Sequence, residues 1–245
     1  QVEDRGAPAW IGNCNELNAA YAADGYARLN GLGAVIVTHG VGALSLVNGI
    51  AGSYSEHVPV VCICGTVPLK SARWGSMMHH TLADGGRDNF YRIFTEITAA
   101  QAKLTPHNVV EEVDRLLTVA WRERLPVYME LPSDIANIVI AVPAKPLELT
   151  QQASDCERIQ LATRAILDRI RASRSPAFLL DMDADRFRVR ELVAEFAEKM
   201  RIPVAVLNSG RSAFSEQSPL FAGVYAGKYS KPAVRELVEG SDCLI

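Results

Sequence analysis

The sequence is poor in cysteine, and its cysteines do not form a recognisable site. Its 245 residues include five cysteines, an odd number, and none has the spacing of a metal site. Cys62 and Cys64 alternate within an apolar segment, so both thiols are expected to be buried on one side of a strand. Because no disulfide framework is indicated, we expect a reducing, cytoplasmic setting.

Long apolar runs and a strong charge of either sign are also missing. The longest apolar segments, such as Gly33–Thr38, have the length of a strand and fall short of a membrane span. The net charge of -3 gives no reason to expect a nucleic-acid or anionic-membrane partner. Hydrophobic residues make up 49% and charged residues 22%, which is typical of a globular protein with a large core.

The two ends of the sequence suggest a longer natural chain. It begins with Gln1 in place of Met, and it stops within the apolar stretch Asp242–Ile245, which resembles the opening of an unpaired strand. We therefore expect sequence to be missing at both ends, and we see no secretory leader.

Strand-like and helix-like segments alternate along the first part of the chain, which predicts a parallel α/β sheet. Expected helices are 15–28, 42–55, 88–95 and 106–124, and expected strands are 34–38, 58–64, 98–103 and 126–131.

A linker and a second α/β unit follow. Residues 141–156 contain two prolines and no clear period, which is typical of a linker. Beyond it we expect helices at 157–172, 188–200 and 232–239, with strands at 176–181 and 203–207. The predicted fold is therefore two parallel-sheet, three-layer α/β domains, residues 1–140 and an incomplete domain at 157–245.

Two motifs in the first unit carry titratable side chains. Glu16 lies in the first turn of an Ala-rich helix, where the helix dipole favours an anion, and capping of that helix end alone would also explain it. His79 and His80 stand in tandem in a loop with Gly75, without the spacing of a metal site. A carboxylate on a rigid element and titratable histidines on a loop are suited to moving protons.

These motifs resemble those of thiamine-diphosphate-dependent 2-oxo acid decarboxylases, which act on pyruvate, indolepyruvate or branched-chain keto acids. The similarity is carried by the segments 12–28, 38–45, 48–60 and 79–85. It runs from about Gly12 to Leu131 as the family's pyrimidine-binding domain, and more weakly through its Rossmann-like middle domain. The resemblance implies a carboxy-lyase that converts a 2-oxo acid to an aldehyde and CO₂.

The resemblance also implies roles for individual residues. The matching glutamate, Glu16, hydrogen-bonds the aminopyrimidine ring, so that the cofactor removes its own thiazolium C2 proton. Val41 contacts the pyrimidine face. Thr38 is placed to hold the substrate carboxylate, although its presence is explained equally well if it is only a β-branched residue that ends a strand. His79 and His80 line the active site and relay protons, with His80 also orienting the substrate.

Other parts of the family's machinery have no match here. The family holds Mg²⁺ and the diphosphate through a later domain, so this chain offers no metal ligands and is expected to be inactive alone. Its glutamate serves a cofactor held by a partner subunit, which implies a homodimer or tetramer. Two departures stand near the histidines: His39 replaces an aromatic residue, and Gly86-Arg87 is expected to loosen the loop.

Three alternatives remain open. Gly40-Val-Gly42 after a strand could belong to a dinucleotide-binding turn, but the third glycine is replaced by Ser45 and no acidic residue follows the next strand. An acetolactate-synthase-like carboligase would share the fold and the glutamate. A non-catalytic subunit or fragment would use the scaffold for association only.

Overall fold

The computed structural model describes residues 8–73, 77–150 and 153–245, with the side chains of residues 72 and 73 left out. The chain divides into two compact units, Gln1–Gln151 and Gln152–Ile245.

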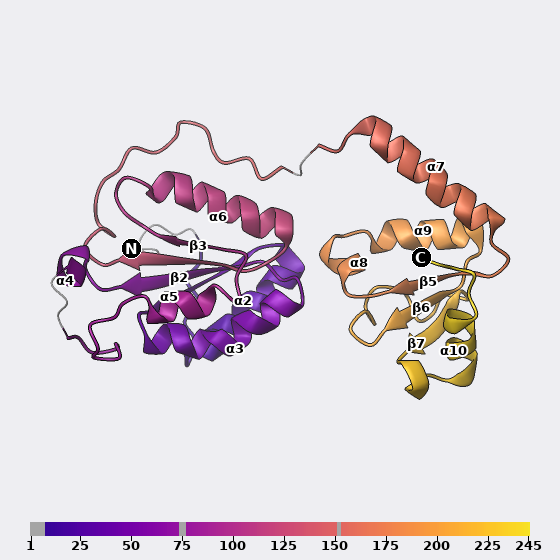
Figure 1. Cartoon of the computed structure of the whole chain (residues 1–245), viewed down its shortest axis with the longest axis horizontal. Coiled ribbons are helices and arrows are strands. Elements are labelled where there is room, and N and C mark those ends of the chain that lie inside the picture. Colours follow the sequence, from indigo (N-terminus) through magenta and orange to yellow (C-terminus); the bar gives the residue numbers. More distant parts are fainter. Residues whose placement is uncertain (1–7, 74–76, 151–152) are drawn as a thin grey trace. The chain divides into compact units, whose positions relative to one another are not determined.

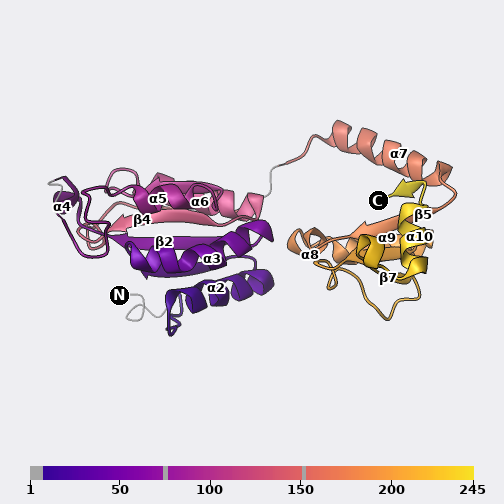
Figure 2. The same ribbon diagram turned by 60° about the horizontal axis from the view of Figure 1, so that its bottom comes forward.

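The first unit is built on a parallel sheet with the strand order β1-β2-β4-β3. Its strands are β1 (Gly33–Thr38), β2 (Val60–Thr66), β3 (Ala100–Lys103) and β4 (Val127–Pro132). Its helices are α2 (Glu16–Asn30), α3 (Val41–Ser55), α4 (Leu69–Arg73), α5 (Asn89–Phe94) and α6 (Val109–Glu123). Helix α6 covers one face of the sheet and helices α2, α3 and α5 lie on the other (Figures 1 and 2). The predicted parallel α/β fold is confirmed.

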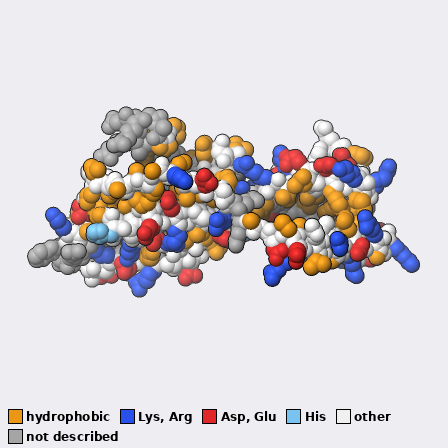
Figure 3. Space-filling model, turned by 90° about the horizontal axis from the view of Figure 1, so that it is seen from above, with side chains coloured by type: hydrophobic (Ala, Val, Ile, Leu, Met, Phe, Trp, Pro, Cys, Tyr) orange, Lys and Arg blue, Asp and Glu red, His pale blue; other side chains and the backbone are white. Residues whose placement is uncertain are grey.

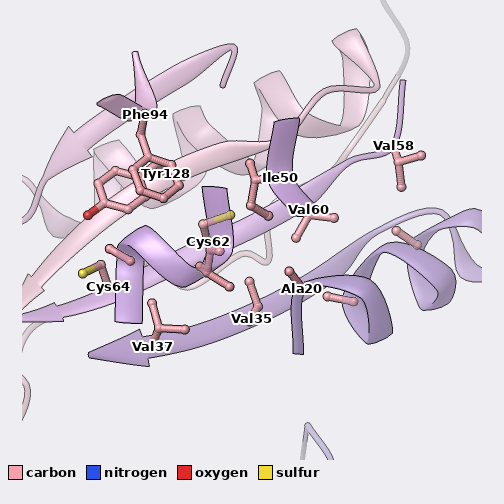
Figure 4. Close-up of a cluster of buried hydrophobic side chains, with 14 residues drawn as sticks. Ala20, Val35, Val37, Ile50, Val58, Val60, Cys62, Cys64, Phe94 and Tyr128 are labelled. Carbon is pink, nitrogen blue, oxygen red and sulfur yellow. The ribbon is translucent and has the colours of Figure 1, made fainter. Parts of the chain in front are cut away.

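The main core of this unit lies between the sheet and helices α2, α3 and α5. The rings of Phe94 and Tyr128 stack with their centroids 4.1 Å apart, beside Cys62 and Cys64 of β2 (Figure 4). The sequence predicted that both thiols face one side of a strand, and the structure places both in this core. Burial raises the pKa of the Cys64 thiol to about 11, so it stays protonated.

Helices α2 and α3 approach closely because small residues line their contact. A Cβ on Gly49 of α3 would lie 2.6 Å from the Cβ of Ala20 in α2. Beside this contact, the buried Asp24 carboxylate accepts hydrogen bonds from the Ser53 hydroxyl (2.8 Å) and the Arg28 Nε (2.5 Å). The Ala-rich α2 is thereby fixed against α3, which positions the first turn of each helix.

The second unit carries another parallel sheet, with the order β7-β6-β5-β8. Its strands are β5 (Pro176–Leu180), β6 (Val204–Leu207), β7 (Phe221–Tyr225) and β8 (Cys243–Leu244). Its helices are α7 (Cys156–Ala172), α8 (Asp183–Arg186), α9 (Arg190–Met200) and α10 (Pro232–Glu239), with a 3₁₀ turn, η1 (Gly227–Tyr229).

Two local expectations need correction. The segment Asp242–Ile245 is not an unpaired strand opening, because β8 pairs in parallel with β5 and Asp242 accepts hydrogen bonds from the backbone of Arg174 and Ser175. Helix α6 begins at Val109 instead of Pro106, since the Asn108 side chain holds residues 105–108 in a turn by accepting from the Thr105 N–H at 2.7 Å.

The distribution of surface charge and the lengths of the helices indicate whether the chain could bind nucleic acid or cross a membrane. Figure 3 shows acidic and basic side chains interspersed over the face in view, without the basic stripe typical of a nucleic-acid-binding surface. Among the described residues, the helices are too short or too polar to cross a bilayer.

Candidate active site

The carboxyl end of β1 is where the candidate residues meet. Thr38 is the last residue of β1 and is exposed, and Val41, the first residue of α3, is 51% exposed. Gly40 connects them in a left-handed conformation with φ of 67°, which suits glycine. Carboxyl ends of parallel strands are where open α/β sheets bind ligands.

Glu16 reaches this strand end from the first turn of α2. Its Oε1 lies 3.4 Å from the point where Gly42 would carry a Cβ, and the Thr38 Cγ2 lies 2.9 Å from the same point. Glycine at position 42 therefore leaves room for both side chains at one place.

Glu16 is not needed to cap its helix. Asn15 is the N-cap residue, and its side chain accepts a hydrogen bond from the Asn18 N–H at 2.9 Å. Among the described residues, the Glu16 carboxylate has neither a hydrogen-bond nor an ion-pair partner, and it is only half-buried. These observations favour a ligand contact over the capping explanation that the sequence left open.

The histidine loop lies over the same strand end. The backbone carbonyl oxygen of His80 sits 1.8 Å from the point where Gly40 would carry a Cβ, so only glycine allows this contact. His80 itself has a positive φ of 62°, a conformation that non-glycine residues adopt rarely. The rings of His79 and His80 meet edge to face with centroids 4.7 Å apart, and both residues are exposed. Gly75, which belongs to the same loop, lies outside the described residues.

Contacts within the loop fasten it. The Thr81 hydroxyl donates to the Met78 carbonyl at 2.6 Å, and the Arg87 guanidinium contacts the Met78 sulfur at 3.9 Å and the Ser71 carbonyl at 3.4 Å. The Gly86 N–H donates to Asp84 at 2.9 Å. Instead of loosening the loop, as its sequence suggested, Gly86-Arg87 takes part in holding it.

One buried acid near this end of the sheet was missed at the sequence level. Glu130 in β4 is 6% exposed, and burial raises its pKa to about 7, with Asp88 adding to the effect while Lys103 and Tyr128 oppose it. The Tyr128 hydroxyl donates to Glu130 Oε1 at 3.4 Å. A charged residue inside the apolar run Val127–Pro132 was the signal that could have identified it.

The site geometry does not favour dinucleotide binding. In such a turn the phosphates approach the glycines and the helix N-terminus directly. Here the His80 carbonyl occupies the space over Gly40, which leaves no room for a phosphate there.

Models of two domains from the same protein family match the chain. Residues 1–88 match "Thiamine pyrophosphate enzyme, N-terminal TPP binding domain", and residues 163–245 match "Thiamine pyrophosphate enzyme, central domain". The chain belongs to the thiamine pyrophosphate enzyme family.

Within that family, the chain is similar to 2-oxo acid decarboxylases. It is 41% identical over 241 residues to a pyruvate decarboxylase of Aspergillus terreus and 38% identical over 241 residues to pyruvate decarboxylase isozyme 2 of Saccharomyces cerevisiae. It is 43% identical over 238 residues to an alpha-keto-acid decarboxylase of Mycobacterium tuberculosis. Each match covers 96% of the chain but only 42% of the relative, so the chain spans less than half the length of these proteins. The resemblance seen in the motifs is thus confirmed.

Proposed function

We propose that the protein to which this chain belongs is a thiamine-diphosphate-dependent decarboxylase that converts a 2-oxo acid to an aldehyde and CO₂. The main observation in support of this proposal is that the side chains of Glu16 and Thr38 lie close together beside Gly42. This place is the carboxyl end of β1, over which the backbone of His80 lies. The names of the similar proteins, pyruvate decarboxylase and alpha-keto-acid decarboxylase, support the same reaction class.

The residues at this strand end fit the pyrimidine half of the cofactor. The space beside Gly42 is bordered by the Glu16 carboxylate, and the half-exposed Val41 offers an apolar surface for a flat ring. Bound thiamine diphosphate supplies an electron sink for the bond that breaks when CO₂ leaves. Glu16 then holds a proton shared with a ring nitrogen of the aminopyrimidine, which polarises the ring, and Val41 orients its face.

Thr38, His79 and His80 serve the substrate in this proposal. Thr38 is an exposed residue, and its hydroxyl donates a hydrogen bond to the substrate carboxylate. The two exposed imidazoles can each carry and release a proton, so they deliver the proton that replaces CO₂, and His80 helps to orient the substrate.

The remaining parts lie in sequence beyond this chain. We assign Mg²⁺ and the diphosphate mainly to a later domain, so the present residues alone are expected to be inactive. We assign residues 1–140 to a pyrimidine-binding domain, 141–156 to a linker, and 157–245 to part of a Rossmann-like middle domain. Five free cysteines agree with a cytoplasmic setting.

We further propose a homodimer or tetramer. Exposed apolar side chains on α2 offer a surface for a second copy: Tyr21 is 52% exposed, Tyr26 59% and Leu29 84%. Sedimentation of the intact protein tests this assignment, and a monomer at micromolar concentration would contradict it.

The reaction is tested by measuring CO₂ and product from the intact protein with thiamine diphosphate, Mg²⁺ and a panel of 2-oxo acids. Aldehyde formed in equal amount to CO₂ supports the proposal. Acetolactate formed in place of aldehyde would favour a carboligase, and absence of turnover with every substrate would favour an association subunit.

A further inference from the structure

His39 is a buried imidazole that the proposed reaction does not use. It stands between Thr38 and Gly40 and is only 5% exposed. In the described part of the chain, neither of its ring nitrogens has a hydrogen-bond partner. Buried polar groups are nearly always hydrogen-bonded, so an imidazole kept in this state needs an explanation.

The surroundings of His39 connect it to the histidine loop. Its ring meets the ring of Phe90 in α5 edge to face, with centroids 5.4 Å apart and an interplanar angle of 87°. Phe90 Cε2 lies 3.3 Å from the position of a Cβ on Gly40, the same position that the His80 carbonyl approaches to 1.8 Å. His39, Phe90 and the backbone of His80 therefore form one packed layer at the end of β1.

The charges around this layer disfavour a protonated His39. Burial is the first cause that lowers the pKa of His39 below its ordinary value of 6.5, and the charges of Arg87 and His80 add to it. Arg87 lies just before α5 and His80 lies on the loop, so these two charged groups face His39 from the elements packed against it, while Phe90 is uncharged. The ring is therefore mostly neutral at neutral pH, and it becomes protonated only in acid.

The loop depends on such support because its backbone is strained. His80 has a φ of 62° and Ala83 a φ of 56°, and non-glycine residues keep such conformations only where their surroundings enforce them. If the layer beneath His80 is disturbed, the backbone of His80 can relax and move the loop that carries both imidazoles away from the end of β1.

We propose that neutral His39 is a positioning residue that holds the loop carrying His79 and His80 over the end of β1, and that protonation of His39 releases this loop. The positioning of the loop by His39 does not depend on the proposed function. Only its consequence for proton delivery by His79 and His80 rests on that function. The loop is thereby ordered at neutral pH and loosened in acid.

Amide hydrogen exchange of the intact protein without added cofactor tests the proposal. The protection factors of residues 77–88 are compared between about pH 7.5 and pH 5. Protection factors are used in place of exchange rates because they correct for the intrinsic pH dependence of amide exchange. We expect the wild-type loop to lose about tenfold in protection over this range. His39→Phe keeps the ring contact with Phe90 but cannot titrate, so its loop should keep its protection within about twofold.

Two further variants separate positioning from a general loss of stability. His39→Ala removes the ring and should lower loop protection about tenfold already at pH 7.5, while protection of β2 and β4 stays unchanged. His107→Phe makes the same replacement at an exposed histidine and should behave as the wild type. The proposal is overturned if His39→Phe retains the wild-type pH dependence, which would assign it to His79 or His80, or if His39→Ala leaves the loop protected.

Discussion

The Glu16 carboxylate lies beside the place where Gly42 lacks a side chain, with Oε1 3.4 Å from the position of the missing Cβ. The Thr38 methyl group lies 2.9 Å from that position, so these two side chains from α2 and β1 share a space that only glycine at the start of α3 leaves open. The size of residue 42 therefore controls where the candidate catalytic carboxylate can lie.

Gly42→Ala should impair activity much more than stability. The added methyl group displaces Thr38 and Glu16 by a fraction of an ångström, and small misplacements at a reacting centre can lower rates by about tenfold to a hundredfold. We expect turnover of the intact protein to fall by at least about tenfold, while the free energy of unfolding changes by only about 1 kcal/mol, because the helix propensity of alanine offsets part of the crowding.

Gly52→Ala is the matched control for this variant. Gly52 lies in the same helix, and a Cβ there meets no heavy atom within 4 Å. It should leave turnover unchanged and stabilise the helix by up to about 1 kcal/mol. Equal activity of the two variants would contradict the placement of Glu16 beside Gly42.

Asp24→Asn should destabilise the first unit. It removes the buried charge that accepts from Ser53 and Arg28, and loss of a charged partner of a partly buried pair costs about 1–3 kcal/mol. The three tryptophans of this chain, Trp10, Trp74 and Trp121, all fall within residues 1–151, so denaturant unfolding of the chain followed by tryptophan fluorescence reports on this unit rather than on residues 152–245.

Glu56→Gln tests the second ion pair of the Arg28 guanidinium, which also contacts Glu56. Glu56 Oε2 accepts from Arg28 at 2.6 Å, but its side chain is 47% exposed, so we expect a loss below about 1 kcal/mol. An Asp24→Asn variant no less stable than Glu56→Gln would show that the buried carboxylate does not hold α2 to α3.

Glu130→Gln should stabilise the protein in a pH-dependent manner. Since burial raises the pKa of Glu130 from 4.5 to about 7, the folded state binds more protons than the unfolded state between these values. The stability that protonated Glu130 contributes is therefore fully present below about pH 4.5 and is lost as the pH rises through 7. Glutamine cannot ionise, so the gain of the variant over the wild type should be about 2 kcal/mol larger at pH 8 than at pH 5.

The difference in unfolding free energy, measured at both pH values by tryptophan fluorescence, checks this expectation. Glu123→Gln, at an exposed position at the end of α6, provides the control and should show no such trend. A Glu130→Gln gain that is the same at pH 5 and pH 8 would rule out titration of the buried carboxyl.

Much of the fold was predictable because local patterns decided it. Alternating apolar segments gave the parallel α/β class, and Pro232 at the first position of α10 marked where that helix begins. Strand β7 and helix α4 were missed, since Phe221–Tyr225 and Leu69–Arg73 are short and have little periodicity. The pairing of β8 with β5 joins residues far apart in sequence, which no local pattern specifies.

The site was predictable only in its parts. The motifs singled out Glu16, Thr38 and the histidine pair, but their convergence depends on two glycines, Gly40 and Gly42, whose missing side chains admit groups from distant segments. The state of His39 was equally hidden, because its burial comes from Phe90 and the backbone of His80, about fifty and forty residues away.

Whether Glu16 activates the cofactor can be measured by C2 hydrogen–deuterium exchange of thiamine diphosphate bound to the intact protein. We predict that Glu16→Gln lowers the exchange rate by at least about a hundredfold, with unfolding of the first unit unchanged because Asn15 caps α2. An exchange rate equal to that of the wild type, with the cofactor fully bound, would contradict it.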